Sequence, residues 1–294
     1  MNKSFTLIEI LVVIVVIGVL SAFILVGMSS ISNSANIAKG QAFSNSLRNS
    51  LLMNLVAEWK FDDISGTIGS TLPDGTSFSD SWGTYSGTTS GSPTLKGGTD
   101  CVKEECLSFN GSTSYITPTN IALATITANQ LTVETWVKFN VVNVNQFIIT
   151  KNGPIFFYLQ GSTSKLLTQI LTDTWTLNTS TASISTNKWY HTVSIYDGTN
   201  IKLYLNGVAD SSTPKTGNLS GSGCLQIARY NDGGCTTGVS SYFNGLLDET
   251  RIYKGVLSQS QIEERYVSGV NSLLAKGLIS SQEYAQRLKE FAKN

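Results

Sequence analysis

The most constraining feature of the sequence is an apolar run close to its amino terminus. Residues 5–28 read FTLIEILVVIVVIGVLSAFILVGM and contain one charged residue, Glu9. As an α-helix this run would be about 36 Å long, enough to cross the roughly 30 Å hydrocarbon core of a bilayer. A carboxylate inside such a helix is costly and is usually kept for a partner, so the run predicts a membrane span with an interacting Glu9. A plain anchor, in which Glu9 reaches to the interface, is the alternative.

The composition of the remaining chain favours a polar, β-rich extracellular domain over a helical cytoplasmic enzyme. Charged residues make up 14% of the 294 residues, against a usual value of about a quarter, and proline occurs only 5 times. The formal net charge is zero and the sequence contains no long basic run. Without a source of phosphate-neutralising charge, nucleic acid is not expected as the main ligand.

The four cysteines form two local pairs in the sequence, Cys101 with Cys106 and Cys224 with Cys235. Local pairing is the simplest of three connectivities, and it predicts two disulfides formed in an oxidising, extracytoplasmic compartment. A zinc site is the rival interpretation. It is disfavoured because the chain has one histidine, His191, and the cysteine spacings differ from those of paired ligand knuckles.

The first residues do not have the order of an ordinary secretory signal, because the polar leader is four residues long and the apolar run is too long. The words FTLIEILVVIVVIGVL resemble the start of type IV pilins and pseudopilins. The resemblance implies that a prepilin peptidase cuts between Ser4 and Phe5, that Phe5 is then N-methylated, and that Glu9 pairs with the terminal amine of a neighbouring subunit. An ammonium created by cleavage would thereby neutralise a carboxylate inside a low-dielectric helix bundle.

Two positions depart from the pilin pattern. Ser4 stands where the family usually has glycine, and the proline often found further along the helix is missing near Val26 and Gly27. Beyond the span, apolar residues recur three or four positions apart from Ile31 to Leu55, as in an amphipathic helix. We therefore expect a leader over residues 1–4 and one long helix over 5–56, of which 5–28 are transmembrane.

From residue 57 the apolar pattern changes to the alternation of short strands, with turn dipeptides at Asp197-Gly198 and Asn206-Gly207. The ordered words EWKFDD, LSFNGSTSYI, LTVETWVKF, NKWYHTVSIYDGTNIKLYLNG and FNGLLDETRIYKGVLSQSQI resemble laminin-G-like, concanavalin-A-like jelly rolls of bacterial surface proteins. The predicted fold class is α+β, with the amino-terminal helix followed by an antiparallel jelly-roll head over 57–269.

The last residues, 270–294, predict a short helical hairpin. Ser258 and Gln261 fit a capping box before it, a first helix is expected to end near Gly277, and Ser280 with Glu283 fits a second capping pair. The apolar face of this tail needs a partner surface, which is either its own head or a neighbouring subunit.

The sequence offers no convincing catalytic pair, although glucanases share the jelly-roll superfold. A retaining glycosidase needs two carboxyl groups about 5 Å apart, and the candidate strand LTVETWVKF supplies only Glu134. Asp248 and Glu249 are adjacent, so in a regular strand they would point to opposite faces. His191 has no nucleophile motif beside it and is expected to be structural. We therefore expect that the chain is not an enzyme.

Ligand contact is expected from aromatic residues in loops, where function tends to sit. Four candidates could stack on sugars, pack against filament neighbours or close the sandwich: Trp82, Tyr85, Trp175 and Tyr242. The jelly-roll resemblance also implies a possible structural calcium ion held by Asp248 in the word GLLDETRIY, and Asp62 is a second candidate.

Together these features predict a major or minor structural subunit of a type IV pilus-like filament, with a lectin-like head for adhesion or glycan binding. Its expected partners are other subunits, a prepilin peptidase, the inner membrane before assembly, and a glycan or surface protein. The precursor would lie in the cytoplasmic membrane and the assembled form at the cell surface. A pseudopilin of a secretion or DNA-uptake apparatus is the alternative, followed by a surface-anchored glycosidase.

Overall fold

The computed structural model describes residues 54–81, 84–118, 129–221, 223–230 and 240–291. All of them belong to one compact unit, Asn54–Asn294, which is the head. The predicted leader and almost all of the predicted helix over 5–56 lie outside the described residues. At its end that prediction is wrong by two residues, because strand β1 (Leu55–Trp59) has already begun. Within the described ranges, no helix combines the length and apolarity needed to cross a membrane.

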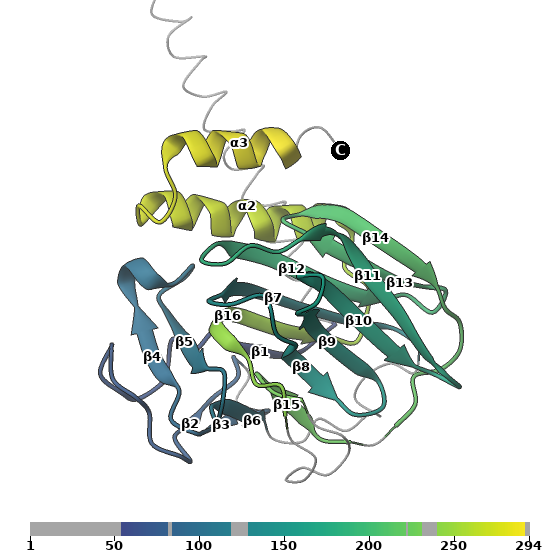
Figure 1. Cartoon of the computed structure of the whole chain (residues 1–294), viewed down its shortest axis with the longest axis horizontal. Coiled ribbons are helices and arrows are strands. Elements are labelled where there is room, and N and C mark those ends of the chain that lie inside the picture. The colour runs from purple at the N-terminus through teal and green to yellow at the C-terminus, as the bar shows by residue number, and fades with distance from the viewer. Residues whose placement is uncertain (1–53, 82–83, 119–128, 222, 231–239, 292–294) are drawn as a thin grey trace, which may run out of the picture. The chain divides into compact units, whose positions relative to one another are not determined.

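The described strands form two antiparallel sheets of eight strands each, packed as a sandwich (Figure 1). Sheet A has the spatial order β14 (Val208–Pro214), β13 (Asn200–Leu205), β12 (Trp189–Tyr196), β7 (Leu131–Phe139), β16 (Asn244–Tyr253), β5 (Glu105–Asn110) and β4 (Thr94–Gly97), with β1 paired to β16. Sheet B has the order β11 (Trp175–Ser183), β10 (Lys165–Leu171), β9 (Ile155–Gln160), β8 (Gln146–Lys151), β15 (Leu225–Ile227), β6 (Tyr115–Pro118), β3 (Gly87–Ser90) and β2 (Ser77–Phe78). The jelly-roll expectation is confirmed at the level of a two-sheet antiparallel sandwich.

Alternation along the strands builds the core between the sheets. In β7, Leu131, Val133, Val137 and Phe139 point into the intersheet core, while Trp136 belongs to a second cluster on the other face of sheet A. A period of two places successive side chains on opposite faces, so one strand supplies both clusters. Both aromatic side chains of this strand, Trp136 and Phe139, are therefore buried.

The two predicted hairpin turns are present. Asn206 and Gly207 have φ of 53° and 81° and connect β13 to β14, as a tight turn with two left-handed residues requires. In the turn between β12 and β13, the carboxylate of Asp197 accepts the backbone N–H groups of Thr199 at 2.8 Å and Asn200 at 2.7 Å. These turns fix the register of the three strands at one edge of sheet A.

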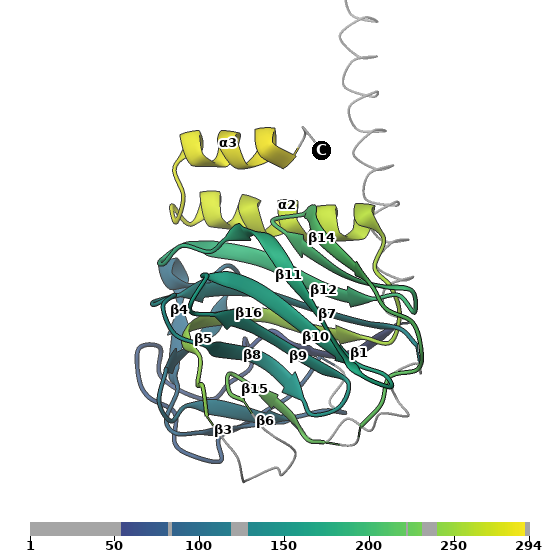
Figure 2. The same ribbon diagram turned by 45° about the vertical axis from the view of Figure 1, so that its right-hand side comes forward.

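Two helices follow the last strand. α2 (Gln259–Ala275) starts at the predicted capping box of Ser258 and Gln261, and α3 (Ser281–Phe291) starts where Ser280 Oγ accepts the N–H of Glu283 at 3.1 Å. Figures 1 and 2 show α2 lying between the strands and α3. The predicted boundary between head and tail at residue 269 falls inside α2, which continues without a break, and Gly269 lies against the indole of Trp136.

The helices cover the outer face of sheet A. Tyr266, Val270 and Leu273 of α2 form a buried cluster with Trp136 and Trp189. The partner surface of the tail, which the sequence leaves open between head and neighbour, is thus supplied by the chain's own head for α2. The outer face of sheet B has no such helix among the described elements.

Candidate functional site

The outer face of sheet B carries a cluster of aromatic side chains. In β9, Ile155, Phe157 and Leu159 point into the core between the sheets. Phe156 and Tyr158 alternate with them and therefore lie on the opposite face. This face is on the side of the sandwich away from sheet A and its helices.

Five rings make up this cluster, which we call the aromatic platform: Phe147, Phe156, Tyr158, Trp175 and Tyr230. Trp175 stacks on Phe156 with 4.7 Å between ring centroids and 12° between planes, and Phe147 stacks on Tyr158 at 4.5 Å and 10°. Tyr230 lies 4.8 Å from Phe147 and 5.5 Å from Phe156, so it joins the two pairs. Pairs of this kind contribute about 0.5–1.5 kcal/mol each beyond the area they bury, which keeps the rings in fixed positions.

Exposure on the platform is concentrated at one side chain. Phe147 and Phe156 are nearly buried, whereas Trp175 is 39% exposed. Leu177, two residues along β11 and therefore on the same face, is 42% exposed. One face of the Trp175 indole is covered by Phe156, so its exposed area is available to a flat ligand.

Polar groups continue the platform toward β6. The guanidinium of Arg229 lies 3.5 Å from the centroid of the Tyr115 ring, and the ring of Tyr242 lies 6.3 Å from that of Tyr115. Gln226 Oε1 accepts from Arg229 Nε at 3.0 Å and from Thr117 Oγ1 at 3.2 Å. Stacking and hydrogen bonding together hold this group in one arrangement.

Strand pairing places the aromatic platform and the polar side chains around Gln226 on the same face of sheet B. Gln226 lies opposite Thr150 of β8, and Thr150 lies opposite Phe156 of β9. Directly opposed residues in an antiparallel pair share a face of the sheet. Thr150 and Gln226 are fully buried and Arg229 is nearly so, so this polar group supports the platform and is not part of its exposed surface.

The strands of sheet B, as described, contain no Asp or Glu; their only charged residues are Lys151 and Lys165. In sheet A the described strands contain six acidic residues: Glu58, Glu105, Glu134, Asp210, Asp248 and Glu249. Because carboxylates are segregated onto sheet A, the outer face of sheet B is neutral to slightly positive.

The four loop aromatics predicted from the sequence have different positions. Trp175 starts strand β11 and belongs to the platform, so its assignment to a loop is corrected by the strand that contains it. Tyr242 lies beside Tyr115 on the same face. Tyr85 packs against the intersheet core, and its carbonyl accepts from Trp59 Nε1 at 2.7 Å, which favours the sandwich-closing alternative. Trp82 lies outside the described residues.

Sequence reasoning missed most of the platform. Phe147 lies in β8, Phe156 and Tyr158 lie in β9, and Tyr230 is the third residue after β15. The sequence IFFYLQG could have indicated the platform. Phe156 and Tyr158 occupy alternate positions in this strand, and the positions between them are also apolar. Such a strand is covered on one face and carries a second apolar surface on the other.

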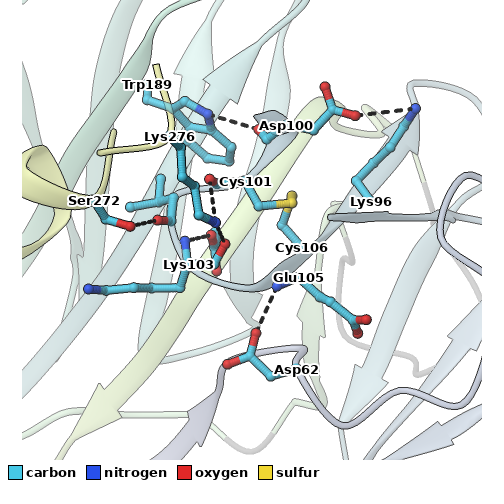
Figure 3. Close-up of a disulfide and its surroundings, with 12 residues drawn as sticks. Asp62, Lys96, Asp100, Cys101, Lys103, Glu105, Cys106, Trp189, Ser272 and Lys276 are labelled. Carbon is cyan, nitrogen blue, oxygen red and sulfur yellow. Dashed lines mark hydrogen bonds and ion pairs between the residues drawn. A yellow bond between two sulfur atoms is a disulfide. The ribbon is translucent and has the colours of Figure 1, made fainter. Parts of the chain in front are cut away.

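The predicted disulfide between Cys101 and Cys106 is present, with 5.6 Å between Cα atoms (Figure 3). It closes a loop before β5 whose backbone contacts α2, since Ser272 Oγ donates to the carbonyl of Val102. Cys224 is also disulfide-bonded. Its predicted partner, Cys235, lies outside the described residues, so that pairing stays a prediction.

The two carboxylates predicted to bind calcium lie near this loop. Asp248 Oδ2 accepts the N–H of Lys103 at 2.8 Å, and Asp62 Oδ1 accepts the N–H of Glu105 at 2.9 Å. Burial, reinforced by the neighbouring charge of Glu249, raises the pKa of Asp248 well above its usual range. Burial without a compensating cation disfavours the charged form of this carboxyl group.

The carbonyl groups of the loop are already engaged by an ammonium group. Lys276 Nζ, at the end of α2, donates to the carbonyl of Cys101 at 3.2 Å and to that of Lys103 (Figure 3). Within the described residues, no group of three or more His, Cys, Asp or Glu side chains is placed to hold a metal ion. A calcium ion needs six to eight oxygen ligands, and two of the loop carbonyls already accept from Lys276, so these residues do not fit it as they are arranged.

Substituting Lys276 tests whether an internal cation stabilises this loop. In Lys276→Met, two carbonyl oxygens lose their donor, and we expect the free energy of unfolding to fall by about 1–3 kcal/mol. Lys289→Met, on the exposed surface of α3, should change it by less than about 0.5 kcal/mol. Thermal unfolding of the wild type should be the same with calcium and with EDTA. A melting temperature that rises with calcium would contradict this assignment.

Glu134 lies at the centre of a buried ionic cluster beneath α2. It is fully buried, and its Oε1 lies 2.9 Å from His191 Nε2 while its Oε2 accepts from the Tyr253 hydroxyl at 2.9 Å. Arg251 Nη1 and Arg265 Nε lie 3.8 and 3.5 Å from the carboxylate oxygens. Burial alone would raise the pKa of Glu134, but Arg265, Arg251 and His191 outweigh it and hold that pKa well below its usual range.

The expected opposite orientation of Asp248 and Glu249 is not observed, because β16 contains a bulge. The register shifts between Asp248 and Arg251, and Glu249 has φ of 51°. The carboxylate of Glu249 consequently pairs with Arg251, which also bonds Glu58 at 2.5 Å. Glu249 thus joins the ionic cluster under α2 instead of the intersheet core.

Comparison with known structures supports the sandwich assignment. Domain 4 of AbnA, a GH43 extracellular arabinanase from Geobacillus stearothermophilus solved with arabinotriose, is 23% identical, with a TM-score of 0.55, covering 72% of this chain and 97% of that domain. The ligand-binding domain of botulinum neurotoxin serotype D, solved with N-acetylneuraminic acid, is 12% identical, with a TM-score of 0.51. The match spans 76% of this chain and about half, 53%, of the neurotoxin domain. At these identities the similarity shows the fold.

Two family matches cover separate parts of the sequence. Residues 1–25 match the prokaryotic N-terminal methylation motif, which confirms the prepilin-type resemblance. Residues 110–263 match the family described as concanavalin A-like lectin/glucanases superfamily. A search of curated proteins finds no match. Because the second match covers just over half of the chain, the protein belongs to the concanavalin A-like lectin/glucanases superfamily.

Proposed function

We propose that this chain is a structural subunit, major or minor, of a type IV pilus-like surface filament, and that its head binds glycans. The proposal rests on one observation, which is that a single sequence contains both a prepilin-type motif and a lectin-like domain. A prepilin-type methylation motif occupies residues 1–25, and a lectin-like sandwich begins within about thirty residues of it. The first part provides membrane insertion and assembly, and the second is the part displayed.

The assembly role rests on the chemistry of the first residues. Cleavage between Ser4 and Phe5 would create a new amine at Phe5, four positions before Glu9. In a bundle of apolar helices a lone carboxylate is strongly destabilising, whereas one paired with a neighbour's amine is tolerated and fixes the register of the two helices. The precursor would lie in the cytoplasmic membrane and be carried to the cell surface on assembly.

The binding role rests on the outer face of sheet B. That face combines fixed aromatic rings with hydroxyl and amide groups, and the described strands of sheet B contain no Asp or Glu. Small ligands are usually bound where apolar and aromatic side chains surround a few placed polar groups. The structurally similar arabinanase and neurotoxin domains were solved with sugars, which motivates glycans as the ligand class.

We infer that the head acts by binding and not by catalysis. Glu134, the carboxylate that the sequence singled out, is fully buried and has both oxygens engaged by His191 and Tyr253. Asp248 is also buried. A glycosidase acid and nucleophile must both reach the scissile bond, which these side chains do not. Incubating the head with polysaccharides should release no reducing ends.

The assembly proposal is tested at Glu9. In cells producing Glu9→Gln, we expect the amount of this subunit in sheared filaments to fall by at least about tenfold, because the substitution leaves the neighbouring amine without its buried partner. Mass spectrometry of the wild type should find a chain that starts at a methylated Phe5. An intact Met1, or filaments that incorporate Glu9→Gln normally, would refute the proposed assembly.

The position of the subunit and its ligand are tested separately. Immunogold labelling on extended filaments is expected for a pilus subunit, along their full length if it is the major one, whereas a pseudopilin of a secretion or DNA-uptake apparatus would stay at the cell envelope. A glycan array probed with the folded protein should give reproducible signals. An array with no signal would remove glycan binding and leave the filament role unaffected.

A further inference from the structure

We propose that the aromatic platform is the ligand-binding site of the head, and that it holds a short stretch of an uncharged oligosaccharide with one ring stacked on Trp175. This inference rests on the proposed function, which names glycans as a class but assigns no site to them. In Figure 1 the strands concerned lie side by side in the order β8, β9, β10 and β11, and Figure 2 shows the same strands from another side.

The geometry of Trp175 favours a flat, weakly polar ligand. Its indole is fixed from behind by Phe156 at 4.7 Å and 12°, and 39% of the side chain remains exposed. A ring already held in place loses little conformational freedom when it is covered, which lowers the cost of binding. The electron-rich face of an indole attracts the partially positive C–H groups that line one face of a sugar ring.

The surroundings supply hydrogen-bonding groups without a fixed charge. Gln169 of β10 is half-buried, lies opposite Phe156 and Leu177 in the two neighbouring strand pairs, and so shares their face. Thr179 follows on β11 with the same orientation. Amide and hydroxyl groups beside an aromatic ring can satisfy sugar hydroxyls, which makes the arrangement suitable for an oligosaccharide.

The charge distribution favours an uncharged sugar over an anionic one. Of the two basic residues on this face, Arg229 is already engaged, because it stacks on Tyr115 and bonds Gln226, and it is 3% exposed. Lys165 lies at the far end of β10, six residues and about 20 Å along the strand from the position that pairs with Trp175. An acidic sugar would therefore find little exposed positive charge to repay the loss of its hydration.

A protein partner would need a larger surface. Trp175 and Leu177 are the exposed large apolar side chains on this face within the described residues. A standard protein interface engages roughly 20–30 residues on each side, whereas one exposed indole with a neighbouring leucine matches one or two sugar rings.

The head also has an open cavity of about 760 Å³, lined by polar residues that include Asp173, Lys215 and Asn218. This cavity is the alternative place at which the head could bind a sugar.

Binding of the full-length chain, held in detergent micelles, to xylotriose, cellotriose, mannotriose, chitotriose and 3′-sialyllactose tests the inference by calorimetry. We expect the wild type to bind at least one uncharged trisaccharide and Trp175→Ala to bind it about tenfold or more weakly. Trp175→Phe, which retains a ring, should lose less. Asn218→Ala, in the competing cavity, should bind as the wild type does. The half-exposed position of Trp175 lets these variants fold, which near-ultraviolet circular dichroism verifies.

Each other outcome has a definite meaning. If the wild type binds and Trp175→Ala binds equally well, or if Asn218→Ala loses binding instead, the platform assignment is wrong while glycan binding by the head stands. If only 3′-sialyllactose binds, the uncharged class is wrong. If none of the five probes binds, this inference is overturned, and the wider glycan array then decides separately whether the head binds glycans at all.

Discussion

Replacing Glu134 by Gln is expected to lower the free energy of unfolding of the head by about 3–5 kcal/mol. The side chain is fully buried between His191, Tyr253, Arg251 and Arg265. A neutral amide of the same size removes the negative charge and leaves Arg265 beside a group that cannot balance it. Breaking a buried pair from one side is costly because the remaining charge loses its partner in a poorly solvated place; Arg265 is only 20% exposed, whereas Arg251 keeps Glu58 and Glu249.

Urea unfolding of the full-length chain in a mild detergent measures this effect. Glu104→Gln is the matched control, because it removes the same charge from an exposed side chain near the disulfide loop, and it should change stability by less than about 0.5 kcal/mol. A loss below about 1 kcal/mol for Glu134→Gln would mean that the cluster contributes little and that packing alone holds α2.

The difference in stability between the wild type and Glu134→Gln is expected to depend on pH. The pKa of Glu134 is held below the 4.5 of an unperturbed glutamate, so the unfolded chain takes up this proton first as the pH falls. The stability that the charge contributes is therefore fully present above about pH 4.5 and is lost as the pH falls toward the folded pKa. The difference between wild type and Glu134→Gln should accordingly shrink in acid. The raised pKa of Asp248 changes the free energy of unfolding with pH in the opposite direction. This contribution is the same in the wild type and in Glu134→Gln, so it cancels in the difference between them.

The fold was predictable where local chemistry determines it. Alternation identified strands such as β12 and β13, and the dipeptides Asp197-Gly198 and Asn206-Gly207 identified two turns, because period and φ > 0 are properties of a few adjacent residues. The capping box at Ser258 was readable for the same reason. Which sheet each strand joins depends on pairings between distant segments, and no local pattern encodes it.

The site was predictable only in part, since it depends on neighbours far apart in the sequence. Trp175 was selected as an exposed aromatic, but its stacking on Phe156 and the link to Phe147 through Tyr230 arise from three separate segments. Likewise, Asp248 was predicted to bind calcium from the local sequence GLLDETRIY alone. Lys276, 28 positions later and in a helix assigned to a separate tail, is the residue that engages the nearby carbonyl groups.

A second large effect is expected on removing the main contact between α2 and sheet A. Tyr266 is 1% exposed, and its ring lies 6.0 Å from Trp136 and 6.2 Å from His191, stacked on both. It also covers the turn at Gly207, which has no room for a side chain beneath the ring. Tyr266→Ala would leave a cavity between the helix and the sheet, so the free energy of unfolding should fall by about 3–5 kcal/mol.

Tyr266→Phe separates the ring from the hydroxyl group and should cost less than about 1.5 kcal/mol, because the packing volume is retained. The region of the head that loses stability in Tyr266→Ala is also predicted. Since Tyr266 contacts α3 through Phe291, at 6.0 Å between rings, amide hydrogen exchange in Tyr266→Ala should speed up across α2 and α3 before it does so in sheet B. Equal stability of the two variants, or uniform exchange across both sheets, would show that the helices are held mainly by the ionic cluster around Glu134 and not by this aromatic contact.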